Sequence, residues 1–480
     1  MSKKPHPLTK LSAKFLPFAD AASDGLPMNE LLRLSLFQVS VGMATVMLLG
    51  TLNRVMIVEL SVPAIVVAMM IAVPVLVAPF RALMGFRSDN HRSAIGWKRV
   101  PYMWFGTLWQ MGGLAIMPFS LLLLSGDQTL GPTWAGEVFA AIAFLMTGLG
   151  LHMTQTAGLA LASDRATDET RPRVVALLYV MFLLGMGISS IVIGWLLRDF
   201  SSIRLIRVVQ GAAVVTILLN VVALWKQERM CPMSKEEREA PQPGFGDAWR
   251  DFIRGGSAGR LLAVVFLGTL AFSMQDVLLE PYGGQILGLS VSSTTLLTAL
   301  WAFGALVGFG LAARWLGQGM NSHRMGALGI LGGIVAFTLV IFAGPLHSGL
   351  LFFLGAMLIG FGGGLFSVST LTAAMALPVR DFAGRGLALG AWGAAQATAS
   401  GLAVALGGAL RDGIGHLATA GVLGEGLNTP ATGYAAVYHI EIVLLFVTLM
   451  VLGPLVRPQD RNNHPNRDSS AKIGLADFPT

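Results

Sequence analysis

The sequence predicts an all-α membrane protein with twelve transmembrane helices in two homologous halves. Of its 480 residues, 54% are hydrophobic and 12% are charged, which is about half the charged fraction of a soluble domain. About 20 apolar residues are needed for a helix to cross a bilayer once, and the length of the chain accommodates a dozen such spans. The chain also repeats, because Arg173 and Arg385 lie 212 positions apart and Arg198 and Arg411 lie 213 apart. A near-constant offset of about half the chain indicates two related halves.

The apolar runs divide into two groups of six. The first group falls near 31–52, 62–83, 100–123, 135–161, 174–197 and 204–225, and the second near 260–280, 292–315, 324–345, 349–376, 386–410 and 434–456. They predict an N-terminal arm (1–30), a six-helix half (31–226), a polar linker (227–259), a second six-helix half (260–457) and a polar tail (458–480). We find no pattern of a signal peptide. The single cysteine excludes an intramolecular disulfide.

Loop charges predict that both termini lie in the cytoplasm. In that orientation only five of the 33 lysines and arginines face outward, namely Arg54, Arg198, Arg204, Arg207 and Arg411. An excess of basic residues in cytoplasmic loops is the usual pattern of membrane proteins. Arg81 is counted among the loop charges of 81–99. Because the basic residues are scattered over short loops, the net charge of +7 indicates contact with membrane lipids and no nucleic-acid partner.

A polar group lies at the end of the seventh span, where Gln275, Asp276 and Glu280 follow an apolar run. Residues four apart share one face of a helix and lie about 6 Å apart along its axis. Because a charge at hydrocarbon depth costs at least a few kcal/mol, we expect a functional cavity around Gln275 and Asp276. For Glu280, a polar helix end facing water is an equally good interpretation. Pro281 and the glycines after it are expected to end the helix.

The fourth span carries His152 and Gln155, which are three apart and share a face among small residues. Neutral imidazole is a common metal ligand, so His152 is a candidate ligand for the central magnesium of a tetrapyrrole. A buried histidine that hydrogen-bonds a neighbouring helix is the alternative, and the spacing alone favours it. No other metal site is indicated.

The connection after the second span is dense in charge and contains Gly85, Asp89, Arg92, Lys98 and Arg99. It resembles the loop after the second helix of the major facilitator superfamily, although its spacing differs. Asp89 is placed to accept an N–H from a neighbouring helix start or to pair with an arginine, which would latch one conformation. A basic anchor loop is the simpler interpretation, and both can hold.

Motifs of common enzymes are absent from the sequence. It has no nucleotide-binding glycine loop, no zinc-type Cys/His cluster and no nucleophile elbow. We therefore expect a protein that is not an enzyme.

Three segments, 52–60, 152–162 and 274–285, carry a resemblance to the PucC/LhaA group, the bacteriochlorophyll-delivery branch of the major facilitator superfamily in purple phototrophic bacteria. The resemblance extends from about residue 11 to 456. It implies a factor in the intracytoplasmic photosynthetic membrane that hands bacteriochlorophyll to light-harvesting antenna polypeptides or shields them during assembly. PucC is linked to the peripheral antenna (LH2) and LhaA to the core antenna (LH1), and we favour the core antenna.

The resemblance implies a-type bacteriochlorophyll as cofactor, with carotenoid as a further pigment. It implies antenna polypeptides as partners, together with the reaction centre and the machinery of pigment synthesis. The candidate pigment-binding residues are His152, Gln155, Gln275, Asp276, Glu280, Tyr282 and Gln285, and a candidate outer mouth comprises Asn53, Arg54 and Glu59. Two alternatives remain open: a proton-coupled transporter of a small solute, with Asp276 and Glu280 carrying the proton, and a scaffold that holds antenna helices without pigment.

Overall fold

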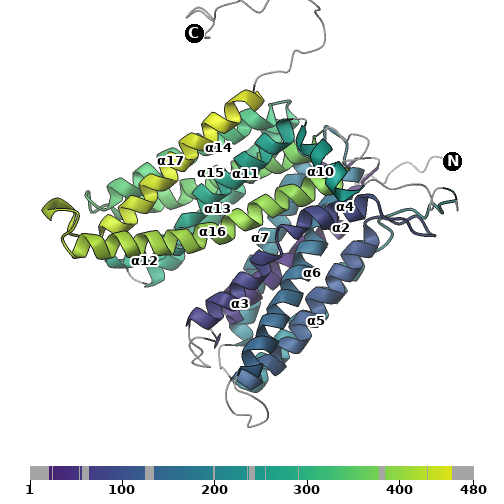
Figure 1. Cartoon of the computed structure of the whole chain (residues 1–480), viewed down its shortest axis with the longest axis horizontal. Helices are drawn as coiled ribbons and strands as arrows, with labels where there is room; N and C mark the ends of the chain where they lie inside the picture. Colours follow the sequence, from purple (N-terminus) through teal and green to yellow (C-terminus); the bar gives the residue numbers. More distant parts are fainter. Residues whose placement is uncertain are drawn as a thin grey trace, which may run out of the picture.

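The computed structural model describes residues 21–23, 25–52, 55–56, 64–124, 134–197, 201–234, 236, 244–254, 256–289, 291–377, 384–429 and 431–456. Within these ranges the long elements are all helices (Figure 1). A single isolated β-bridge, between Ser23 and Leu26, is the only extended pairing in the same ranges. The prediction of an all-α fold is confirmed.

The N-terminal half contains six crossings. They are formed by α2 (Met28–Thr45) with the π-helical η2 (Val46–Leu52), α3 (Ala64–Leu76) with α4 (Phe80–Asp89), α5 (Val100–Leu124), α6 (Ala135–Arg165), α7 (Arg171–Leu196) and α8 (Ser202–Leu224). The C-terminal half repeats this number with α11 (Ser257–Ser273), 3₁₀-helical η4 (Met274–Val277) and α12 (Leu279–Gln285) as one crossing, followed by α13 (Val291–Gly317), α14 (Ser322–Ala343), α15 (Gly349–Met375), α16 (Arg385–Thr419) and α17 (Ala431–Val456).

The second crossing is built from two short helices. Eleven helical segments of the described chain are long and apolar enough to span a membrane, and the α3–α4 pair supplies a twelfth crossing that is broken between the two helices. The Ala78 N–H bonds the Val75 carbonyl in place of the Pro74 carbonyl that a regular helix would use. Pro79, directly before α4, has no N–H to continue the ladder. The break leaves the Pro74 carbonyl available to another group.

The seventh crossing is also interrupted, contrary to the expectation of one helix through 260–280. The chain tightens to a 3₁₀ turn at Met274–Val277, where the Leu278 N–H bonds the Gln275 carbonyl. The physical reason is that Pro281 has no N–H to bond the Val277 carbonyl. Asp276 and Glu280 therefore do not follow one another at α-helical spacing, and α12 continues through Pro281 instead of ending there.

The linker contains a helix that the sequence analysis does not predict, α10 (Phe245–Arg254). Its apolar residues Phe245, Trp249 and Phe252 are spaced by four and three, so they share one face. This face packs on Phe86 of α4, with 5.5 Å between the Phe245 and Phe86 ring centroids, and joins a buried cluster with the start of α16. The linker thus covers the place where the two halves meet.

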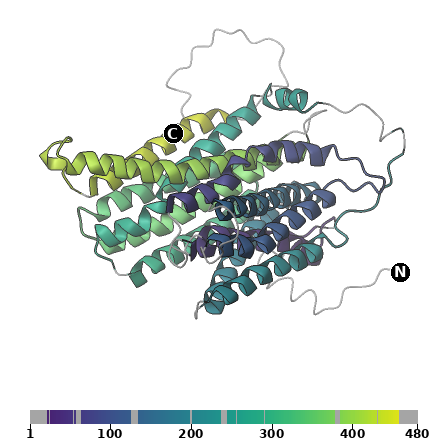
Figure 2. The ribbon, with the colours of Figure 1, turned by 60° about the horizontal axis from the view of Figure 1, so that its bottom comes forward.

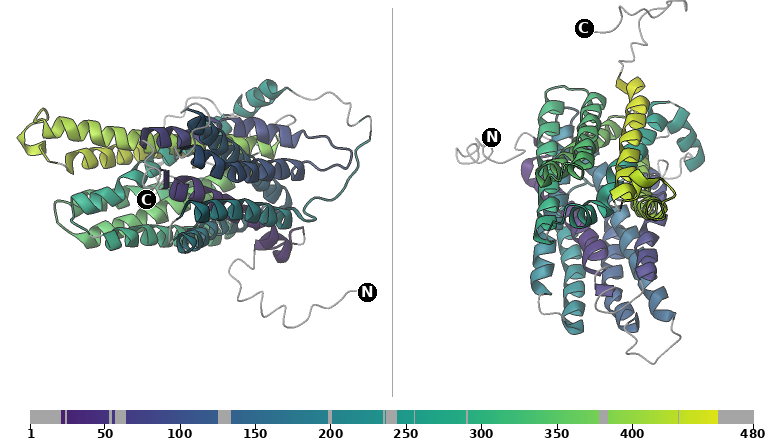
Figure 3. Two further views of the ribbon diagram at one scale, coloured as in Figure 1. Left: turned by 90° about the horizontal axis from the view of Figure 1, so that it is seen from below. Right: turned by 90° about the vertical axis from the view of Figure 1, so that its left-hand side faces the viewer.

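The halves touch through α4 against α16 and through α7 against α13. Figure 1 shows them joined near α4 and the start of α16, with their opposite ends apart. Figures 2 and 3 show from other directions that the purple-to-blue half and the green-to-yellow half occupy different ends of the molecule. A Cβ at Gly390 would lie 2.1 Å from the Arg81 carbonyl oxygen, and one at Gly386 would lie 2.4 Å from the Gly85 carbonyl oxygen. The contact between α4 and α16 is therefore one of backbone on backbone.

This contact predicts that Gly390→Ala lowers the free energy of unfolding by about 1–3 kcal/mol, because the added methyl group forces the helices apart. Gly408, on the same helix, has no heavy atom within 4 Å of an added Cβ. Gly408→Ala should leave stability unchanged or raise it by up to ~1 kcal/mol through helix propensity. Thermal unfolding of the two variants in one detergent, followed by circular dichroism, measures the difference. Equal midpoints would contradict the close contact.

Candidate functional site

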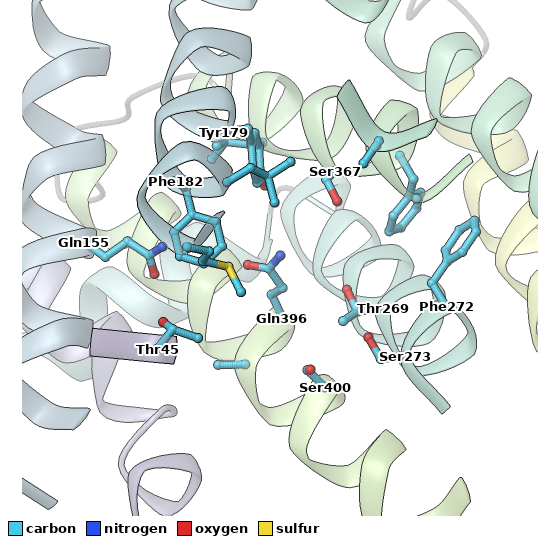
Figure 4. A pocket seen from close by; sticks show the side chains of 18 of the residues that line it. Thr45, Gln155, Tyr179, Phe182, Thr269, Phe272, Ser273, Ser367, Gln396 and Ser400 are labelled. Atoms are coloured by element: carbon cyan, nitrogen blue, oxygen red, sulfur yellow. The ribbon is translucent and has the colours of Figure 1, made fainter. Parts of the chain in front are cut away.

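A cavity of about 490 Å³ lies between the two halves, within the ~300–1,000 Å³ typical of ligand pockets. It is lined from the N-terminal half by residues of α2, α4, α6 and α7, and from the C-terminal half by residues of α11, η4, α13, α15 and α16. Figure 4 shows Gln155 and Tyr179 on one side of it and Thr269 and Ser273 on the other. Each half thus contributes one wall.

The walls combine aromatic and apolar side chains with a few polar groups. Phe182 comes from α7, Trp301 and Phe309 from α13, and Trp392 from α16. The Tyr179 and Phe309 rings stack across the two halves with centroids 5.1 Å apart. The polar residues include Gln38, Gln155, Gln396, Ser367 and Ser400. Such a lining suits a flat, largely apolar ligand with a few oriented polar contacts.

His152 lines the cavity and is 8% exposed. Its Nε2 lies 3.2 Å from the Pro74 carbonyl oxygen, which the break after α3 leaves available. Because a carbonyl oxygen only accepts, Nε2 carries a proton, and in the neutral imidazole Nδ1 then keeps the lone pair. Nδ1 is buried and has no hydrogen-bond partner in the described chain. Nε2 therefore makes the hydrogen bond to a neighbouring helix that was the alternative interpretation, and Nδ1 is the nitrogen that could bind a metal. A metal reaches Nδ1 only if the side chains covering it move.

Asp276 also lines the cavity and is exposed to it. Gln275, the residue before it, is 3% exposed, and its amide donates to the Asp276 carboxylate and to the Phe272 carbonyl oxygen at 3.4 Å. His152, Gln155 and Asp276 are thus brought together in one cavity, with Gln275 behind Asp276. The side chain of Glu280 lies outside the described residues.

Tyr282 and Gln285 lie away from this cavity. Tyr282 is buried in an aromatic cluster, with its ring centroid 5.5 Å from that of Phe352. Gln285 Oε1 accepts from Arg411 at 2.8 Å and from the Tyr434 hydroxyl at 2.7 Å. These contacts join α12, α16 and α17 within the C-terminal half. The candidate outer-mouth residues Asn53, Arg54 and Glu59 lie outside the described residues.

Arg81 is the residue of the cavity that the sequence analysis misplaces, because it counts Arg81 as a loop charge. The structure buries it at 2% exposure in the cavity wall. Its Nε donates to Thr156 Oγ1 and one terminal nitrogen to Gln155 Oε1, both at 3.0 Å, and the other terminal nitrogen donates to the Gly393 carbonyl at 3.4 Å. An arginine at membrane depth costs roughly 3 kcal/mol or more. The available signal was its position inside the apolar run 62–83.

Gly85 and Asp89, which were predicted in a charged loop, lie in the last turns of α4, and Asp89 contacts the start of α16. Asp89 accepts the N–H groups of Gly386 and Leu387, both at 2.8 Å, and forms an ion pair with Arg99. It therefore makes both contacts that its position suggested, one of them to a helix N-terminus that favours negative charge. A Cβ at Gly85 would lie 1.8 Å from the Gly386 carbonyl oxygen.

Arg99 extends this network. It also pairs with Asp164 at 3.1 Å, and Asp164 lies 3.5 Å from Arg385 at the start of α16. Burial acts to lower the pKa of Arg99, but the carboxylates of Asp89 and Asp164 outweigh it and hold that pKa above its ordinary value. The Lys98 backbone N–H donates to Glu228 of the linker at 3.1 Å. Arg92 of the same loop is also engaged in an interaction. The loop thus ties the halves and the linker together.

No group of three or more His, Cys, Asp or Glu side chains that suits a metal ion occurs among the described residues. The polar side chains of the described lining are three glutamine amides, several hydroxyls, two indole N–H groups, one imidazole, one guanidinium and one carboxylate. This set is suited to binding an organic ligand.

The family model described as PUCC protein matches residues 51–460 of this chain. The chain belongs to the PUCC protein family. It is 67% identical over 470 residues to a Rhodobacter capsulatus protein described as "Uncharacterized protein in puhA-bchM intergenic region", which covers 98% of each chain. It is 49% identical over 455 residues to the Protein PucC of the same organism, covering 94% of this chain and 97% of the relative.

The fold of this PUCC-family chain is that of the major facilitator superfamily. A solved proton:xylose symporter of that superfamily superposes with a TM-score of 0.60 at 14% sequence identity, covering 89% of this chain and 98% of the symporter. The predicted architecture of twelve helices in two halves is consistent with this match. The chain is a multi-pass membrane protein.

Proposed function

We propose that this chain is an assembly factor for the bacterial light-harvesting antenna, which binds bacteriochlorophyll and delivers it to antenna polypeptides. The observation that carries the proposal is the central cavity, in which an imidazole, amides and aromatic walls converge in a member of the PUCC family. A tetrapyrrole is a flat, largely apolar body with a metal and a few polar substituents, and these are the contacts that the cavity offers.

Within the cavity, His152 is the preferred candidate to hold the magnesium of the pigment. The oxygen of Gln155 already accepts from Arg81, whereas Nδ1 of His152 keeps its lone pair. Asp276 would face polar substituents of the ring from the opposite half. A bound pigment would supply the light absorption, and the residues that line the cavity would position the pigment and exclude water. The proposed location is the intracytoplasmic photosynthetic membrane, with both termini in the cytoplasm.

The core antenna is the proposed destination. The chain is more similar to the R. capsulatus protein of the puhA-bchM region, at 67% identity, than to the PucC of that organism, at 49%. Of these two relatives from one organism, this chain groups with the one that is not called PucC. That grouping favours the branch that the sequence analysis associates with the core antenna, with the reaction centre and pigment-synthesis proteins as further proposed partners.

Deletion of the gene in a phototrophic host should lower the near-infrared absorbance of the core antenna and leave the peripheral antenna in place. Complementation tests the site, because His152→Ala should fail to restore the core antenna whereas His439→Ala should restore it. His439 is exposed on α17, and its hydrogen bond among the described residues is to the Ala435 carbonyl of its own helix. Loss of the peripheral antenna alone would overturn the assignment to the core antenna. Restoration by both variants would remove His152 from the site.

A proton-coupled transporter of a small solute is the second candidate, and one observation favours it. Asp276 faces the cavity from η4, and Glu441 of α17, which packs against η4, is fully buried. Carboxyl groups at membrane depth are common in proton relays. Glu441 is therefore the buried carboxyl available to act with Asp276, a role that the sequence analysis gave to Glu280.

This candidate predicts that proteoliposomes loaded with a pH-sensitive dye take up protons when a low-molecular-mass extract of the host is added. Asp276→Asn should abolish the signal, because the amide cannot carry a proton. Asp412→Asn, at an exposed residue near the far end of α16, is the matched control and should retain it. A dye signal that never exceeds that of empty liposomes would exclude this candidate.

A further inference from the structure

Arg81 forms no ion pair in the described part of the chain. The guanidinium offers five N–H donors, and its three hydrogen bonds go to a hydroxyl, an amide oxygen and a peptide carbonyl, all of them neutral. Asp276 is the one carboxylate among the described lining residues, and it projects from the other half.

A structural role in joining the halves does not account for a full positive charge. The bond from Arg81 to the Gly393 carbonyl crosses from α4 to α16, but at 3.4 Å it exceeds the usual N–H···O length of about 2.7–3.2 Å. A neutral amide would make such a bond without the cost of burying a cation. The chain also reserves space for the guanidinium, because a Cβ at Gly393 would lie 2.4 Å from Arg81 Cζ.

The surroundings of Arg81 select the chemistry of a partner. Gln155 and Thr156, neighbours on α6, hold two of its nitrogens and so fix the plane of the guanidinium. A guanidinium held in this way recognises a carboxylate, which it can bond with two parallel N–H donors. The rest of the cavity is largely aromatic and apolar, with Trp301 and Trp392 among its walls. The ligand that matches both features is a flat apolar body bearing one carboxylate.

We propose that Arg81 binds the carboxylate of the ligand, and that the central cavity therefore takes a tetrapyrrole as its free acid, before an isoprenoid tail is attached to the ring propionate. The identification of the ligand as a tetrapyrrole rests on the proposed function, and the free-acid form extends it. The reaction that consumes this ligand is then an esterification. In it the carboxylate oxygen bonds the first carbon of a prenyl diphosphate and diphosphate leaves. The chain then takes up the pigment after ring synthesis and holds it until the tail is added, before the delivery to antenna polypeptides that the proposed function describes.

The test compares two ligands that differ only at the carboxylate, magnesium bacteriochlorophyllide a and its methyl ester. Each is titrated into the purified full chain in detergent, and binding is followed by quenching of tryptophan fluorescence, since Trp301 and Trp392 line the cavity. We expect the acid to bind about tenfold more tightly or better, because only the acid pairs its charge with Arg81. This comparison uses the unmodified protein, so its outcome does not depend on the folding of any variant.

Variants then locate the preference. Arg81→Gln should weaken binding of the acid until acid and ester differ by less than about twofold, whereas Arg81→Lys should keep part of the preference because it keeps the charge. Arg250→Gln, at an arginine that is 66% exposed on α10, is the matched control and should behave as the unmodified protein. Circular dichroism checks that each variant is folded. A preference that survives Arg81→Gln would overturn the assignment to Arg81.

The remaining outcomes separate this inference from the proposed function. Equal binding of acid and ester by the unmodified protein would overturn the carboxylate site and leave pigment binding intact. Binding of neither ligand would overturn both. Oleate, a carboxylate on a flexible chain, should displace the acid only in large excess. Displacement by oleate at equal concentration would show that the site selects any fatty anion and would overturn the assignment to a tetrapyrrole.

Discussion

The close approach of α4 and α16 is the constraint on which the rest of the structure depends. Glycines at 85, 386 and 390 let two backbones meet across the halves. A Cβ at any of these positions would clash with backbone atoms of the facing helix, and rearrangement of side chains alone could not relieve that clash. In a membrane the hydrophobic effect does not drive helices together, so they associate through close packing, and small residues allow that close approach. Asp89 strengthens the same contact by accepting two N–H groups at the start of α16. Arg81 of α4 and Trp392 of α16 line the cavity beside this contact.

The same contact sets the electrostatics of the cavity. Arg81 follows the break between α3 and α4, so its side chain enters the space between the halves at the place where the glycines bring α16 near. Asp276 enters from the opposite half because the chain tightens before Pro281. Both polar features therefore arise where proline interrupts a membrane helix, and neighbouring helices supply hydrogen bonds to the freed groups. The His152 bond to the Pro74 carbonyl is one such case. The cavity presents a cation on one wall and a carboxylate on the other.

Composition and periodicity predict much of the fold, because membrane spans are long apolar runs whose length the bilayer sets. They also bring His152, Gln155 and Asp276 forward as candidates, since polar residues inside such runs are rare. The interruptions of the second and seventh crossings are not predicted from composition and periodicity. α3 and α4 together form one apolar run, and Asp276 was placed on a regular helix. Arg81 was misassigned for a related reason, because a charge near the end of a span looks like a loop charge until the partner half is seen. The α10 helix was missed because its apolar face is only three residues within a polar linker. Pairing of distant segments, such as Arg81 with Gly393, is not encoded in any local pattern.

We propose that the cavity of this PUCC-family chain holds bacteriochlorophyll or its untailed acid. The most direct measurement is an absorption spectrum of the protein purified in mild detergent from a strain that makes pigment but lacks antenna and reaction-centre polypeptides. We expect near-infrared absorbance corresponding to about one pigment per chain, with the protein's helical circular dichroism intact. A colourless, well-folded protein would contradict it and would favour the solute transporter or a pigment-free scaffold.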